Sequence, residues 1–275
     1  MKDSLVLGID AAWTMKNPSG VALIQGRGKS WNLVAASSSY ESFLAFSGTG
    51  RGRLGIGKTG SEVDPKAMLK KCKELSGGLS ANVVAVDMPL SEKLITARRV
   101  ADQLVSKEYG QKWCAVHSPS VVRPGKISVN LTKGFENQSF PLMVSESIPP
   151  VTPALIEVYP HVALVELMNL PKRLPYKVSK ATKYWPKEQY PDGEPGFRYG
   201  RIIDSLETAW AALGKDIDLP ALPIPKTGQV MNELKASEDL LDGVVCAWMG
   251  MKYLAREAKP WGDLQGAIWG PKPLG

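Results

Sequence analysis

Cysteine and histidine are scarce in this chain of 275 residues, which contains three cysteines and two histidines. The cysteines (Cys72, Cys114 and Cys246) are widely spaced, and the sequence has no Cys-x-x-Cys pair and no Cys/His cluster. This spacing excludes the common zinc sites and offers no disulfide framework. We therefore expect a reducing, cytoplasmic location.

Long hydrophobic runs are also missing. No apolar stretch approaches the roughly 20 residues that span a bilayer, so we expect no membrane partner. The first residues lack the basic segment and apolar stretch that mark a signal peptide, so none is expected. Hydrophobic residues nevertheless make up 44% of the sequence, which is enough for a large core. The length fits a single domain over 1–275 with sizeable insertions.

Acidic residues are outnumbered by basic ones, 27 against 34, giving a net charge of +7. The excess is concentrated at 98–133 and 172–187, and aromatic residues are interleaved in the second segment. Basic and aromatic side chains together suit nucleic acid, because phosphates are neutralised and bases stack. Arg123, Lys177 and Lys180 are candidate phosphate contacts. The alternative is a lysine-rich surface that only faces solvent.

Three predicted strands carry an acid at or near the carboxyl end: residues 4–10 with Asp10, residues 82–87 with Asp87, and residues 153–158 with Glu157. Each is an apolar run of the length expected for a buried strand. Such acids can meet at one edge of a sheet. Each also has a structural alternative, since an aspartate after a strand often forms a local turn and Glu157 could pair with a lysine.

Asp239 and Asp242 lie three residues apart in an apolar helix predicted over 232–257. This spacing places both carboxylates on one helix face. Burying two carboxylates together is unfavourable unless a cation or a proton offsets their repulsion. The pair therefore indicates a divalent-metal site. Helix capping is the alternative, mainly for Asp239, because acids favour the start of a helix.

The order of predicted elements favours an α/β fold. The strands at 4–10, 20–25 and 31–36 begin with a hairpin and are followed by strand and helix units, which predicts a mixed sheet with helices on both faces. The main helices are expected near 64–76, 91–108, 161–169, 201–213 and 232–257. Residues 110–152 and 170–200 are rich in proline, glycine and basic residues, and we expect long, irregular insertions there. An edge strand is predicted at 266–270.

Several of these segments together resemble a known family. They are residues 8–10 with 18–22, residues 86–90, residues 157–161 and residues 239–242. This combination is similar to the family of unknown function numbered 429, whose members are predicted ribonuclease H-like nucleases. The resemblance covers nearly the whole chain and implies a ribonuclease H-like sheet of five or more strands.

The acids also resemble the layout of Holliday-junction resolvases on the same fold. Those enzymes have a first-strand aspartate, a fourth-strand acid and two acids spaced i, i+3 on the last helix, positions matched by Asp10, Asp87, Asp239 and Asp242. Glu157 has no counterpart there, and the Met-Pro after Asp87 departs from that pattern. Resolvases are often dimers, so a homodimer is one expectation from this likeness.

The implied activity is that of a metal-dependent nuclease or phosphodiesterase. Two Mg²⁺ or Mn²⁺ ions, roughly 3.5–4 Å apart, would be bridged by Asp10 and flanked by Asp87 and Asp242. Asp239 or Glu157 would complete the ligand shell. His117, in the insertion, is a candidate general base or substrate contact. Carboxylate ligands suit these ions better than nitrogen or sulfur.

Two other functional classes are open. Residues 52–59 match the Gly-x-x-x-x-Gly-Lys-Thr phosphate-binding pattern of P-loop NTPases. That loop needs a strand before it and a helix starting at Lys58-Thr59, and the glycines before it and Pro65 after it oppose both. The other alternative is a non-catalytic module that binds nucleic acid or protein, although binding alone needs no carboxylate cluster.

Overall fold

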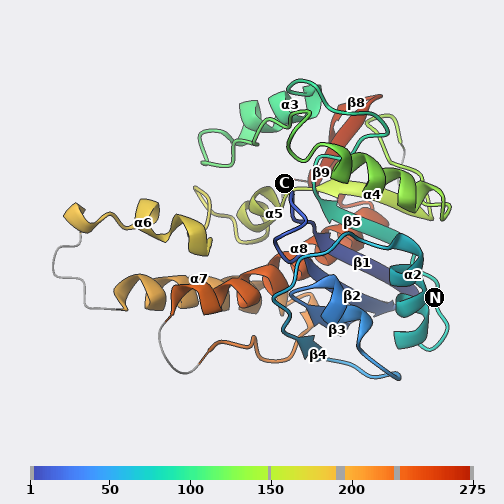
Figure 1. The fold of residues 1–275 in the computed structure, drawn as a ribbon, viewed down its shortest axis with the longest axis horizontal. Helices are drawn as coiled ribbons and strands as arrows, with labels where there is room; N and C mark the ends of the chain where they lie inside the picture. The colour runs from blue at the N-terminus through green and yellow to red at the C-terminus, as the bar shows by residue number, and fades with distance from the viewer. Residues whose placement is uncertain (1–2, 148–149, 190–195, 226–229, 273–275) are drawn as a thin grey trace.

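A mixed β-sheet runs through the middle of the molecule (Figure 1). The computed structural model describes residues 3–147, 150–189, 196–225 and 230–272. Its nine strands are β1 (Ser4–Asp10), β2 (Gly20–Arg27), β3 (Ser30–Ser37), β4 (Arg53–Gly55), β5 (Val83–Asp87), β6 (Ala154–Val158), β7 (Ile217–Asp218), β8 (Ala258–Asp263) and β9 (Gly266–Pro271). The sheet order is β4-β3-β2-β1-β5-β6-β9-β8, with β7 paired to β3.

The strand directions agree with the ribonuclease H-like arrangement predicted from the sequence. β1, β2 and β3 form an antiparallel meander. β5 and β6 continue from β1 in parallel, and β9 joins β6 in parallel. Parallel strands bring their carboxyl ends to the same edge of the sheet. The predicted mixed sheet of five or more strands is confirmed.

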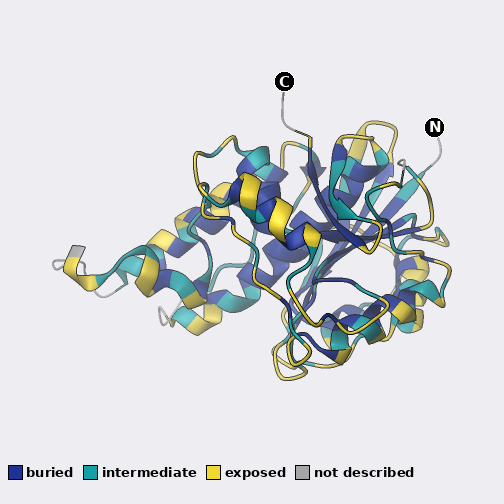
Figure 2. Cartoon of the chain, turned by 90° about the horizontal axis from the view of Figure 1, so that it is seen from above, coloured by how far each residue is buried: buried dark blue, intermediate teal, exposed yellow. Residues whose placement is uncertain are grey.

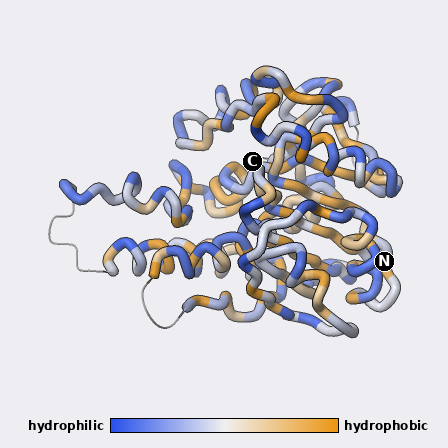
Figure 3. Tube along the Cα trace, in the orientation of Figure 1, coloured by the Kyte–Doolittle hydropathy of each residue, from blue (hydrophilic) through white to orange (hydrophobic). Residues whose placement is uncertain are grey.

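Helices cover both faces of the sheet (Figure 1). They are α1 (Tyr40–Leu44), α2 (Pro65–Leu75), α3 (Val100–Tyr109), α4 (Lys126–Glu136), α5 (Pro160–Leu167), α6 (Ala181–Tyr184), α7 (Phe197–Leu213) and α8 (Leu234–Leu254). One apolar core joins the sheet to α1, α2 and α4, and a second joins it to α5, α7 and α8. A third, smaller cluster joins α3 and α5 to β9. The central strands are buried (Figure 2) and largely hydrophobic (Figure 3), because both of their faces are covered.

Helix α8 crosses the sheet at unusually short range. A Cβ added to Gly8 of β1 would lie 2.3 Å from the backbone nitrogen of Ala247 and 2.3 Å from the carbonyl oxygen of Gly243. A Cβ added to Gly20 would lie 1.9 Å from the carbonyl oxygen of Asp239. Only glycine allows backbones to approach this closely. The contact brings the acids of α8 to the end of β1.

Three predicted elements need correction. The helix expected over 91–108 begins only at Val100, because the preceding residues form a loop and Asp102 caps the start of α3. The insertion at 110–152 contains the amphipathic helix α4. The strand predicted at 266–270 is not an edge strand, since β9 pairs with both β6 and β8. The edge is β8, which can contain Pro260 because an edge strand tolerates a missing N–H.

Residues 52–59 do not form a P-loop. The short strand β4 lies inside the motif, and the next helix starts at Pro65 instead of Lys58-Thr59. The strand–loop–helix order that holds phosphates on backbone N–H groups is therefore missing. Among the residues that the structure describes, no helix is both long enough and apolar enough to cross a bilayer.

Candidate carboxylate site at the sheet edge

Asp10 and Asp87 lie side by side at the carboxyl ends of β1 and β5, where they are direct partners in the parallel register. Asp10 comes two residues after Gly8, and Asp87 comes two residues after Ala85. Residues two apart in a strand lie on the same face, so both carboxylates face the α8 side of the sheet. They line a cavity of about 670 Å³. The predicted meeting of these two strand-end acids is present in the structure.

The environment of this pair disfavours two negative charges. Burial and the nearby charge of Asp242 raise the pKa of Asp10 to about 6, against the opposing effect of Lys177. Burial and the charge of Asp10 raise the pKa of Asp87 well above its usual range. Within the described part of the chain, neither carboxylate has a hydrogen-bond or ion-pair partner. A positively charged ligand would therefore stabilise the pair.

Helix α8 adds Asp239 and Asp242 to this edge, and both are almost fully buried. Asp242 accepts a hydrogen bond of 2.6 Å from the Tyr176 hydroxyl and forms an ion pair with Lys177. Asp239 forms an ion pair with Lys235 through Oδ1, whereas its buried Oδ2 has no hydrogen-bond partner in the described ranges of the chain. Asp239 lies beyond the first turn of α8, so capping does not explain it.

Glu238 connects the two lysines. Its carboxylate lies 3.3 Å from Lys177 Nζ and 3.0 Å from Lys235 Nζ, and it accepts a 2.7 Å hydrogen bond from the Val178 N–H. Burial opposes ionisation, but the two lysines lower its pKa below the usual value. The predicted site residues do not include Glu238, Lys235 or Tyr176. The i, i+3 and i, i+4 spacing of Lys235 from the acids is the available signal for that lysine.

The donor chemistry of the cluster fits a hard divalent cation. Among the described residues, no group of three or more His, Cys, Asp or Glu side chains is already arranged around a metal position. Three features nevertheless match Mg²⁺ or Mn²⁺: the two unpartnered carboxylates of Asp10 and Asp87, the buried free oxygen of Asp239, and the all-oxygen donor set. These three aspartates are the residues that could hold such an ion, while Asp242 is neutralised by Lys177.

Glu157 has a different environment from Asp10 and Asp87. It is level with Val86 in the β5–β6 register, so its side chain points to the opposite face of the sheet. Both of its oxygens bind the Arg99 guanidinium, at 2.6 and 2.7 Å, and one accepts a 2.8 Å hydrogen bond from the Leu90 N–H. These contacts satisfy the hydrogen-bonding capacity of the carboxylate. Glu157 therefore has the structural role that was the alternative to a metal ligand, with an arginine as its partner and not a lysine.

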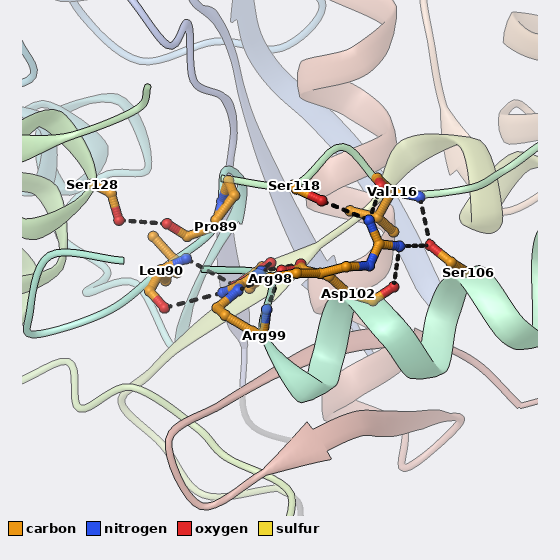
Figure 4. Close-up of polar contacts among 10 residues, drawn as sticks. Pro89, Leu90, Arg98, Arg99, Asp102, Ser106, Val116, Ser118 and Ser128 are labelled. Atoms are coloured by element: carbon orange, nitrogen blue, oxygen red, sulfur yellow. Dashed lines mark hydrogen bonds and ion pairs between the residues drawn. The ribbon is translucent and has the colours of Figure 1, made fainter. Parts of the chain in front are cut away.

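Two adjacent arginines organise the loops beside the cavity (Figure 4). Arg99 also forms a bidentate pair with Asp102, at 2.7 and 3.2 Å, and thus links α3 to β6. Arg98 donates to the Val116 carbonyl at 3.2 Å and to the Ser118 hydroxyl at 2.7 Å. These bonds fix the residues on either side of His117, which lines the cavity.

The wall facing the carboxylates is basic. His117, Arg123 and Lys180 line the cavity, and the Arg123 guanidinium lies 6.0 Å from the centre of the Trp13 ring. Burial and the charges of Lys180, Arg173 and Arg123 lower the pKa of His117, so it is neutral at pH 7. Lys177, by contrast, forms ion pairs with Asp242 and Glu238, so its ammonium group is not unpaired as a phosphate ligand would require.

The fold and the site together define a mixed α/β protein with ribonuclease H-like strand order and a half-buried aspartate pair at the carboxyl edge of its central strands. A family model described as "Protein of unknown function (DUF429)" matches residues 8–262. The chain therefore belongs to this family, and the family membership predicted from the sequence is confirmed. No curated protein and no solved structure matches the chain.

Proposed function

We propose that this protein is a metal-dependent nuclease or phosphodiesterase that hydrolyses phosphodiester bonds at the Asp10–Asp87 edge. One observation carries the proposal. Two half-buried, register-paired carboxylates, which have no hydrogen-bond or ion-pair partner among the described residues, face a cavity whose other wall is basic. The acids favour a bound cation and the basic wall favours a phosphate, and phosphodiester hydrolysis uses both.

In this proposal each part of the site has a role. A Mg²⁺ or Mn²⁺ ion held by Asp10, Asp87 and Asp239 would supply an activated water and positive charge for the leaving oxygen. Arg123 and Lys180 bind and orient the phosphate. His117 is neutral at pH 7 and can accept a proton from the attacking water. Asp242 holds Lys177 beside the carboxylates through their ion pair.

A non-catalytic module that binds nucleic acid or another protein is the second candidate. It is favoured by the internal ion pairs of Lys177 and Lys235, which neutralise Asp242, Glu238 and Asp239 without any metal. The two candidates differ over Asp10 and Asp87, which form no ion pair with any lysine that the structure describes. A nucleic-acid substrate, a cytoplasmic location and a homodimer remain proposals.

Cleavage of a nucleic-acid panel in Mg²⁺ and in Mn²⁺ tests the proposal. The panel contains single strands, duplexes, RNA–DNA hybrids, four-way junctions and cyclic dinucleotides. We expect Asp10→Asn and Asp87→Asn to lower cleavage at least 100-fold, while the exposed Asp204→Asn on α7 serves as a matched control. Activity that survives both site substitutions would overturn the proposal. A folded wild type that binds nucleic acid but cleaves nothing would favour the binding module.

A further inference from the structure

A second cavity of about 320 Å³ adjoins the first. The two cavities share Asp87, His117, Arg123 and Lys180 among their lining residues, so they form one continuous space. The second part extends away from Asp10 toward the start of α5 and is also lined by Arg173. A substrate bound at the aspartate pair would reach into it.

The charge of this second cavity is not balanced. Its lining contains five cations against three carboxylates. Glu157 is paired with Arg99, Glu238 is paired with Lys177 and Lys235, and Asp87 lies at the boundary with the first cavity. Within the described chain, the cations Arg123, Arg173 and Lys180 have no carboxylate partner. Three positive charges on one wall favour an anionic ligand, because the surrounding protein lowers the effective dielectric constant.

Two buried nitrogens in the same wall, Arg173 Nε and His161 Nδ1, have no hydrogen-bond partner among the residues that the structure describes. A buried donor without a partner, such as the Nε–H of Arg173, is unfavourable, and a ligand oxygen would accept its hydrogen bond. His161 is 5% exposed and packs between the rings of Tyr159 and Tyr176. It lies in the first turn of the eight-residue helix α5, where the helix dipole also favours an anion.

We propose that this second cavity binds a terminal phosphate of the substrate, next to the bond that is cleaved. The inference rests on the proposed function. A terminal phosphate carries a charge of about −1.5 to −2 at pH 7, whereas an internal phosphodiester carries a single charge, so the terminal group matches the three unpaired cations better. The volume is at the lower end of the range for ligand cavities, which suits one end of a nucleotide chain.

Isothermal titration calorimetry in EDTA tests this site without turnover. The ligands are a thymidine dinucleotide with a 5′-phosphate, the same dinucleotide with a 3′-phosphate, the unphosphorylated form, and inorganic phosphate alone. We expect one phosphorylated form to bind wild type at least tenfold more tightly than the unphosphorylated form. Arg173→Gln and Lys180→Gln should each reduce this preference about tenfold. Lys172→Gln is the matched control, because Lys172 is exposed and lies over the Trp113 ring instead.

Equal affinity for phosphorylated and unphosphorylated dinucleotides would overturn the inference, as would inorganic phosphate binding as tightly as the dinucleotides. A preference that survives Arg173→Gln and Lys180→Gln, with both variants folded by circular dichroism, would also overturn it. The preference is measured without metal. A wild type that keeps it but cleaves no substrate would therefore contradict the proposed activity and leave the phosphate site standing.

Discussion

Replacing Arg99 with methionine tests the polar network beside the site. Arg99 forms ion pairs of 2.6 Å with Glu157 and 2.7 Å with Asp102, whose side chains are only 4% and 0% exposed. Removing one partner of a buried ion pair costs about 3–5 kcal/mol, because the remaining charge is buried alone. At about 2–4 °C per kcal/mol for a domain of this size, the melting temperature should fall by about 6–20 °C.

The loss should depend on pH. Burial raises the pKa of Glu157, and Arg99 opposes this rise. Without Arg99 the pKa in the folded protein rises further above the unfolded value. The stability contributed by such a carboxyl is complete below the unfolded pKa and is lost as the pH rises through the folded pKa. The deficit of Arg99→Met relative to wild type should therefore grow from pH 5 to pH 8.

Thermal and urea unfolding at pH 5, 6.5 and 8, followed by circular dichroism, measure this effect. Arg98→Met is the control, since it removes the same charge from the neighbouring position. The partners of Arg98 are carbonyls and hydroxyls, including those of Val116 and Ser118, so no buried charge is left alone. The reasoning is refuted if Arg99→Met costs less than Arg98→Met, or if its deficit is the same at every pH.

Three further predictions concern the site itself. Asp10→Asn in EDTA should raise the free energy of unfolding at pH 8 by about 3 kcal/mol, because the pKa of Asp10 is raised from 3.8 to about 6 and the folded state therefore disfavours the ionised carboxylate. The gain should be far smaller near pH 4. Mg²⁺ should then raise the melting temperature of wild type only. A variant no more stable at pH 8 than at pH 4, relative to wild type, would contradict this. Gly8→Ala should lower the free energy of unfolding, measured in urea, by about 3 kcal/mol, because the new Cβ would lie 2.3 Å from the Ala247 nitrogen. A variant with the urea midpoint of wild type would show that α8 can move away from β1. Lys177→Met should cost about 3–5 kcal/mol by leaving Asp242 buried and unpaired, and a loss no larger than that of Lys172→Met would argue against this ion pair.

Asp10 and Asp87 could be placed from the sequence because each ends an apolar run. Such runs form buried strands, and a carboxylate that is the last residue of the run lies at the edge of the sheet, where the core ends. Asp242 could be placed for a similar reason, since an acid inside an apolar helix needs a partner. These local patterns were sufficient for the aspartates and for the mixed sheet.

The orientation and the partner of Glu157 could not be predicted from local sequence patterns. Its strand was predicted, but the face on which its side chain lies depends on the register with β5, and a shift of one residue reverses that face. Its partner Arg99 is 58 residues away in the chain. Lys177 is similar, because its segment has no helical or strand periodicity and its ion pair with Asp242 spans 65 residues. Contacts of this length follow from the tertiary fold.

The glycine contacts between β1 and α8 have a consequence for how substitutions elsewhere would act. The close approach of this helix to the strand that carries Asp10 depends on main-chain atoms at Gly8, Gly20 and Gly243. Loss of a methyl group from the apolar core on the side of α1, α2 and α4, which contains no residue of α8, would therefore weaken the protein as a whole while leaving the acids aligned. Stability and site geometry are separable in this molecule, and variants selected for expression at higher temperature should retain the arrangement of the carboxylates.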